Sequence, residues 1–125
     1  MATIWTGRVL SILCALFLLF DAIGHILKPA PVVDAFARLG MPLNFSVGLG
    51  ILELVLIALY LVPQTGILGA VLLTGYLGGA TAVNLRAGSP PFEVLFPVLF
   101  GVVVWIGIAL RAARARGLFF PTSSR

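Results

Sequence analysis

Hydrophobic residues fill four long stretches of this sequence, and most polar residues lie in the shorter segments between them. A membrane-spanning helix needs about 17 to 25 mostly apolar residues. The pattern therefore predicts four transmembrane helices, at about residues 9–27, 45–62, 66–85 and 92–110. Because these helices use most of the chain, we expect one membrane domain over residues 1–125, an all-α four-helix bundle that ends in a basic cytoplasmic tail, residues 111–125.

The connections between the predicted helices are short, and one of them has a pattern of its own. Residues 28–44 place Pro31 at a helix start, apolar and charged positions on opposite sides, and stop signals at Gly40 and Pro42. This predicts a short amphipathic helix that lies in the membrane interface or packs on the bundle as an ordinary capped helix. Only residues 63–65 separate the second and third predicted helices, so we expect these two to be antiparallel neighbours.

The third predicted helix is rich in glycine. Gly75 and Gly79 have the four-residue spacing that lets two helix backbones approach closely. Gly78 and Ala82 share that side of the helix, because successive residues turn by about 100°. We expect this small face to pack against a neighbouring helix of the same chain, and self-association of two copies is the alternative.

Composition and charge support a membrane protein and suggest its orientation. Charged residues make up 10% of the chain, whereas soluble domains have about 25%. The net charge of +4 comes from basic residues at helix ends, which argues against nucleic-acid binding. If both termini share one side of the membrane, that side carries five arginines, and the other side carries three basic residues. Since arginine excess marks the cytoplasm, we expect both termini to be cytoplasmic.

Four polar side chains interrupt the predicted membrane helices: Asp21 and His25 in the first, Glu53 in the second and Asn84 in the third. An ionisable group at bilayer depth costs about 2.5 to 3.5 kcal/mol, so such groups usually face a protein interior or a wet cavity. Asp21 and His25 are one helical turn apart on one face, where the carboxylate can orient the imidazole. Glu53 belongs to a seven-residue repeat with a serine and a tyrosine, and we expect that stripe to face the bundle.

The estimated depths of these groups suggest one shared pocket. At about 1.5 Å per residue, His25 and Asn84 lie about 4 Å below the outer interface, Asp21 and Thr81 about 10 Å, and Glu53 about 13 Å. All of them fall in the outer half of the bundle. The candidate ligand-binding residues are Asp21, His25, Glu53, Thr81, Asn84 and, at the rim, Arg86.

Each of these groups also has a purely structural interpretation. Asp21 and His25 can form a satisfied buried pair, Glu53 can bond to hydroxyl groups of a neighbouring helix, and Asn84 can link two helices. A zinc or iron site normally uses more histidines than the single one present, so we expect no metal site. The single cysteine, Cys14, excludes an internal disulfide or a dithiol relay within one chain.

The order of several short motifs resembles that of the DoxX-like family over nearly the whole chain. These motifs are FDAIGHILKP, RLGMP, GLGILELVLIALYLVP, GGATAVNLRAG and WIGIALR. The resemblance implies a bacterial four-helix membrane protein of the DoxX or DoxD type, some of whose relatives are linked to quinone-dependent sulfur oxidation or to membrane redox complexes. The residues that match the family pattern are Gly24, Lys28, Glu53, Leu54, Asn84 and Arg86.

Together the residues and the resemblance favour an inner-membrane protein whose pocket binds a small amphipathic ligand such as a quinone, or which serves as the membrane subunit of a redox assembly. Nothing in the residues is specific to sulfur chemistry, and no specific catalytic motif occurs. Three alternatives stay open: a structural or docking protein without chemistry of its own, a small enzyme acting on a lipid or quinone, and a transporter. Soluble or membrane redox partners and a homo-oligomer are the expected associations beyond the lipid bilayer.

Overall fold

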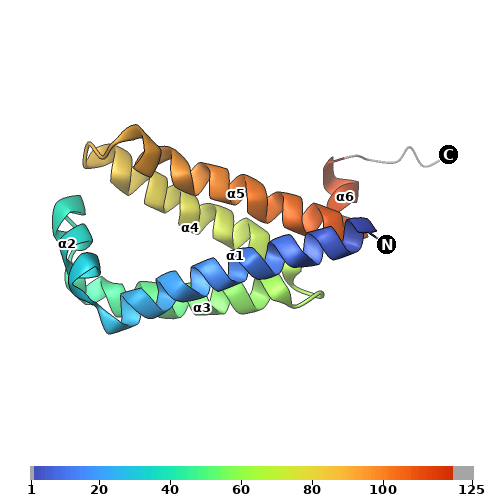
Figure 1. Ribbon diagram of the computed structural model, residues 1–125, viewed down its shortest axis with the longest axis horizontal. Helices are drawn as coiled ribbons and strands as arrows, with labels where there is room; N and C mark the ends of the chain where they lie inside the picture. The colour runs from blue at the N-terminus through green and yellow to red at the C-terminus, as the bar shows by residue number, and fades with distance from the viewer. Residues whose placement is uncertain (1, 120–125) are drawn as a thin grey trace.

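The computed structural model describes residues 2–119, and four long helices dominate it (Figure 1). They are α1 (Ala2–Leu27), α3 (Ser46–Leu61), α4 (Gly66–Arg86) and α5 (Pro91–Arg111). Each of these spans is long and apolar enough to cross a membrane, the second being extended to Leu43 by a short 3₁₀ turn, η1 (Leu43–Phe45). The predicted all-α, four-helix membrane bundle is therefore confirmed.

The first helix starts earlier than the apolar pattern indicated. We expected it from about Val9, whereas α1 begins at Ala2. Gly7 and Arg8 interrupt the hydrophobic run, but neither breaks the helix. Gly7 is buried, and a Cβ added to it would lie 2.6 Å from the main-chain nitrogen of Arg111 in α5. The glycine is therefore part of a close helix contact and does not mark a helix end.

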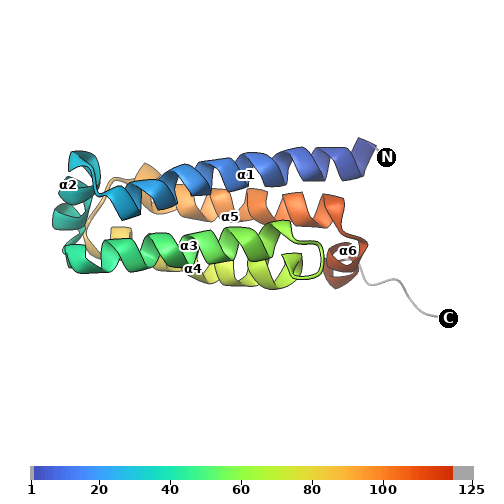
Figure 2. The same cartoon turned by 90° about the horizontal axis from the view of Figure 1, so that it is seen from below.

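The four helices follow one another around the bundle. α1 packs against α3 and α5, and α4 packs against the same two helices, so α1 and α4 lie diagonally (Figures 1 and 2). The turn between α3 and α4 makes these two helices antiparallel neighbours, as predicted. The start of α1, the end of α5 and the α3–α4 turn share one end of the bundle (Figure 1). The short helix α6 (Ala113–Phe119) follows at that end, and the rest of the predicted tail, residues 120–125, lies outside the described residues.

A short helix, α2 (Ala30–Leu39), lies across the opposite end of the bundle (Figure 1). It has Pro31 in its first turn and ends at Gly40, whose φ of 70° is the left-handed conformation typical of a helix C-terminus. Its apolar face buries Phe36, and Arg38 forms a salt bridge of 3.1 Å with Glu93 at the start of α5. The predicted amphipathic helix is therefore present, and it packs on the bundle.

The predicted stripe on the second membrane helix faces the interior. Ser46, Glu53 and Tyr60 are all fully buried. The Tyr60 hydroxyl donates a hydrogen bond of 2.7 Å to the main-chain oxygen of Val104 in α5, and it lies 3.2 Å from the hydroxyl of Ser11 in α1. This side chain therefore joins three of the four long helices through buried polar contacts.

The packing prediction for the small face of α4 is wrong. A Cβ added to Gly75, Gly78 or Gly79 would meet no atom within 4 Å. The close approach occurs elsewhere on α4, at Gly69, where an added Cβ would lie 2.5 Å from Tyr60 Cα. The buried residues of α4 are Gly66, Gly69, Ala70, Leu73 and Leu77, so the glycines on the buried side of α4 belong to its first turns and do not include the predicted pair.

Candidate functional site

A cavity of about 500 Å³ lies within the bundle near the end covered by α2. Residues from α1, α2, α3, α4 and α5 line it. Two of the glycines that were expected to pack against a helix, Gly75 and Gly79, line this cavity and explain part of its volume. The third, Gly78, lines a separate groove between α4 and α5. The lack of side chains at these glycines therefore leaves free volume in the cavity and in the groove.

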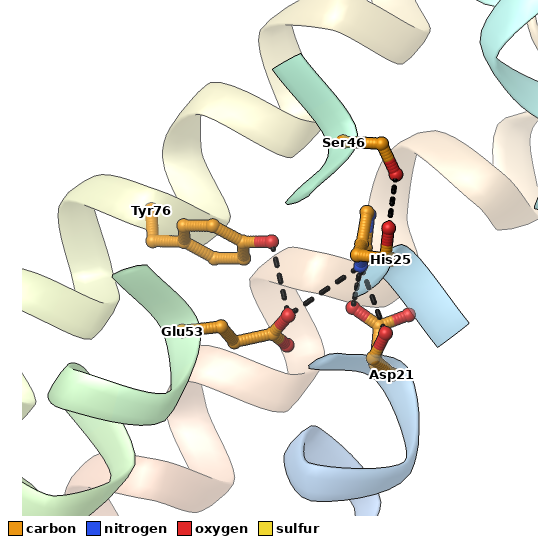
Figure 3. Close-up of polar contacts among 5 residues, drawn as sticks. All are labelled: Asp21, His25, Ser46, Glu53 and Tyr76. Carbon is orange, nitrogen blue, oxygen red and sulfur yellow. Dashed lines mark hydrogen bonds and ion pairs between the residues drawn. The ribbon is translucent and has the colours of Figure 1, made fainter. Parts of the chain in front are cut away.

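A cluster of polar side chains forms one wall of this cavity (Figure 3). His25 Nδ1 lies 2.8 Å from the main-chain oxygen of Asp21, 3.3 Å from Asp21 Oδ2 and 3.6 Å from Glu53 Oε2. A carbonyl oxygen only accepts hydrogen bonds, so the short contact requires Nδ1 to carry a proton. The imidazole is thus oriented by its own helix one turn back, with the Nδ1 atom on the side of the ring that faces both carboxyl groups.

Glu53 is the most deeply buried member of the cluster, with a side-chain exposure of 0%. Its Oε2 accepts a hydrogen bond of 3.2 Å from the hydroxyl of Tyr76 in α4 (Figure 3). Its Oε1 is buried and accepts no hydrogen bond from a donor among the described residues, and the carboxyl group also lies within hydrogen-bonding reach of the Asp21 carboxyl group. A buried polar atom left without a partner costs about 1 to 3 kcal/mol, so this oxygen is a strong candidate to contact something that enters the cavity.

Neighbouring contacts hold His25 in place. The Ser46 hydroxyl donates a hydrogen bond of 2.6 Å to the main-chain oxygen of His25, which ties the last turn of α1 to the first turn of α3 (Figure 3). The Phe36 ring packs edge-on against the imidazole, with 5.7 Å between ring centres. Since Phe36 belongs to α2, the short helix covers the polar cluster from the end of the bundle.

The structure brings together some of the sequence candidates and separates others. Asp21, His25, Glu53 and Asn84 all line the cavity, although the Asn84 amide also donates a hydrogen bond of 2.9 Å within its own helix. Thr81 instead lines the groove between α4 and α5. Its hydroxyl donates to a main-chain oxygen of α4 at 3.1 Å.

Arg86 is exposed and is not among the residues that line this cavity. The depth estimate compared heights along the bundle only, so it could not tell which side of α4 a residue occupies. That is why Thr81, at nearly the same estimated depth as Asp21, turns out to face another groove.

The candidate residues from the sequence did not include Tyr76, so its contact with Glu53 was missed. A signal was available, because Tyr76, Ala80 and Asn84 follow one another at four-residue spacing and therefore lie along one side of α4. The aromatic side of the cavity was also missed. Phe17 packs against Phe100 with ring centres 5.1 Å apart, and both line the cavity.

The polar cluster has the donor types of a metal site, since one potential ligand atom each from Asp21, His25 and Glu53 lie within 4.8 Å of one another. However, a nitrogen that donates a hydrogen bond has no lone pair left for a metal ion. His25 Nδ1 is such a donor, because its 2.8 Å contact is to a main-chain oxygen. The His25 nitrogen that faces the two carboxyl groups therefore acts as a hydrogen-bond donor, while Nε2 keeps its lone pair in the neutral imidazole.

Comparison with known proteins identifies the family. The model of the DoxX-like family matches residues 9–107. The chain belongs to the DoxX-like family. No curated protein and no solved structure was found to match it. The matched region of this DoxX-like protein contains every residue that lines the cavity, and family membership agrees with a small multi-pass membrane protein.

Proposed function

We propose that this DoxX-like protein binds a small amphipathic ligand in the cavity beside Glu53. The observation that carries the proposal is the buried Oε1 atom of Glu53, a residue that lines the cavity; this atom accepts no hydrogen bond from a donor among the described residues. A ligand hydroxyl or carbonyl group would supply the missing partner, because a carboxyl group accepts a hydrogen bond when ionised and can donate one when protonated. A volume of about 500 Å³ is within the usual range of small-molecule sites.

The two sides of the cavity favour a ring-bearing ligand. The polar side offers Glu53 and the His25 imidazole, while Phe17, Phe96 and Phe100 form an aromatic side whose ring centres lie 5.1 to 6.1 Å apart. A quinone matches both sides, since its planar ring can pack against phenyl groups, its oxygens can pair with the polar cluster, and its apolar tail suits a membrane protein. We therefore propose quinones as the ligand class.

The first experiment fills the cavity without changing its polar wall. Gly79→Leu adds a side chain where an added Cβ meets no atom within 4 Å and where the residue lines the cavity. Gly78→Leu is the matched control, because the adjacent glycine has the same free space but lines the other groove. Binding of decylubiquinone, followed by thermal stabilisation in detergent, is expected for the wild type and for Gly78→Leu and is expected to be lost in Gly79→Leu.

A second pair of variants tests the carboxyl group. Glu53→Leu removes both oxygens and is expected to weaken decylubiquinone binding about tenfold, as for one lost hydrogen bond to a buried group. Glu53→Gln keeps an oxygen that can accept from Tyr76 and is expected to retain the fold. If Gly79→Leu and Glu53→Leu bind the quinone as well as the wild type, this cavity is not its site. If native mass spectrometry finds no small molecule on protein released from its own membrane, and decylubiquinone fails to bind, the structural alternative is favoured.

We also propose that the protein lies in a bacterial inner membrane with both termini in the cytoplasm. The arginine-rich end of the bundle, where α1 starts and α5 ends, supports this orientation. In a Cys14→Ala background, an impermeant thiol reagent added outside whole cells is expected to label Asp34→Cys in α2 and to spare Gln64→Cys in the α3–α4 turn. The opposite labelling would invert the orientation. Association with a redox partner and self-association stay predictions from the sequence.

A further inference from the structure

A separate cavity of about 450 Å³ lies at the end of the bundle where α1 starts and α5 ends. Its lining includes Trp5 and Arg8 of α1, Gly66 of α4, and Ile108 and Arg111 of α5. None of the residues that line it also lines the cavity beside the polar cluster. This second cavity is called the basic cavity below.

Two arginines give the basic cavity its charge. Arg111 is held in place, because its guanidinium donates hydrogen bonds to the main-chain oxygens of Tyr60 and Leu61 at the end of α3 and lies 4.6 Å from the centre of the Tyr60 ring. Arg8 is exposed, and its guanidinium carbon lies 5.1 Å from the centre of the Trp5 ring. The Arg111 guanidinium is therefore fixed by hydrogen bonds, whereas the Arg8 guanidinium is exposed and can contact a bound anion.

Among the residues that the structure describes, no acidic side chain lines the basic cavity. The chain has four acidic residues. Asp34 and Glu93 lie at the opposite end of the bundle, and Asp21 and Glu53 line the first cavity. Within residues 2–119 the two arginines thus have no carboxylate partner in this cavity, and they are well placed to attract an anion.

The backbone adds a third positive feature. α4 begins at Gly66, and no side chain caps its first turn, because the Thr65 hydroxyl donates instead to the main-chain oxygen of Leu59 at 2.8 Å. The first N–H groups of a helix have no partner within the helix, and they carry a partial positive charge that favours phosphate. Since Gly66 lines the basic cavity, this helix start and both arginines border the same space.

We propose that the basic cavity binds the phosphate group of an anionic membrane lipid. Its position at the end of four membrane-spanning helices is the depth at which lipid headgroups lie, and Trp5, which is 59% exposed beside it, is a residue type enriched at that depth. Val9 and Ile12 also line the cavity and are exposed, which provides an apolar surface for acyl chains. Basic pockets between transmembrane helices recognise anionic headgroups in this way.

The test is native mass spectrometry of the full chain in detergent with phosphatidylglycerol, with phosphatidylcholine and with inorganic phosphate. Phosphatidylglycerol is expected to bind most tightly to the wild type. Arg8→Gln is expected to weaken its binding about fivefold, the factor that corresponds to about 1 kcal/mol per basic group, while Arg8→Lys retains most of it. Arg86→Gln makes the same change of charge at the other end of the bundle and is expected to leave the affinity unchanged.

Three outcomes would overturn the proposal. Equal binding of phosphatidylcholine and phosphatidylglycerol would show that the cavity does not recognise the lipid's negative charge. Phosphatidylglycerol binding that is insensitive to Arg8→Gln would place the lipid elsewhere. Inorganic phosphate binding as tightly as the lipid would assign the cavity to a soluble anion. The Arg8→Gln variant is expected to fold, because Arg8 is exposed and its side chain contacts Trp5. None of these results depends on whether a quinone binds beside Glu53.

Discussion

Replacing Gly69 by alanine is expected to destabilise the bundle, whereas the same change at Gly79 is not. A Cβ at Gly69 would lie 2.5 Å from Tyr60 Cα and 2.8 Å from the carbonyl carbon of Leu59. Both are main-chain atoms of α3, so no side-chain rotation relieves the clash. Since carbon atoms pack at about 3.5 to 4.0 Å, α3 and α4 would have to separate by about 1 Å.

Both substitutions gain the same helix propensity, so the difference between the free energies of unfolding of the two variants measures the steric cost. Alanine is favoured over glycine in a helix by about 1 kcal/mol, and this is the main effect expected at Gly79, where an added Cβ meets no atom within 4 Å. Overpacking costs about 1 to 3 kcal/mol, and a clash with main-chain atoms belongs at the upper end. We therefore expect Gly69→Ala to be about 3 kcal/mol less stable than Gly79→Ala.

Unfolding by sodium dodecyl sulfate in mixed micelles, followed by circular dichroism, measures this difference. The wild type is expected to lie between the two variants. Equal free energies of unfolding, or a Gly69→Ala protein that is more stable than Gly79→Ala, would refute the assignment of the close helix contact to Gly69.

Three further substitutions test contacts described above. Ser46→Ala removes the donor to the His25 carbonyl and is expected to lower the free energy of unfolding by about 1 kcal/mol; no change in the same unfolding assay would show that this bond adds nothing. Tyr60→Phe deletes a buried hydroxyl and is expected to cost about 1 to 2 kcal/mol, and a variant as stable as the wild type would contradict that role. Arg38→Gln breaks the exposed salt bridge to Glu93 and is expected to change global stability by less than about 1 kcal/mol, yet to speed hydrogen exchange in α2; unchanged exchange would show that packing alone holds that helix.

The sequence was sufficient to predict the elements that depend on local pattern. Apolar run length indicated four membrane helices, and Pro31 with Gly40 delimited the amphipathic helix. The inward stripe of α3 also followed from periodicity, because a seven-residue repeat keeps side chains close to one line along a helix. These features depend on residues near one another in the chain, so no tertiary information was needed.

The candidate site was harder to predict because it depends on how each helix is rotated about its axis. Depth estimates placed Thr81 with Asp21, yet the rotation of α4 directs Thr81 into another groove. Spacing alone indicated that Gly75 and Gly79 pack closely, yet the pair lines open space. The Tyr76 to Glu53 contact joins two helices, and its geometry follows only from their packing.

The glycines beside the polar cluster make the volume of the cavity easy to change by single mutations. Its volume depends partly on side chains that α4 lacks at Gly75 and Gly79, where an added Cβ meets no atom within 4 Å. Every glycine codon is one base change from an alanine codon, so single mutations can narrow this space in small steps without a clash against the backbone. Substitutions at these two positions are therefore expected to change the size of the proposed ligand that fits the cavity without altering the hydrogen-bonded cluster.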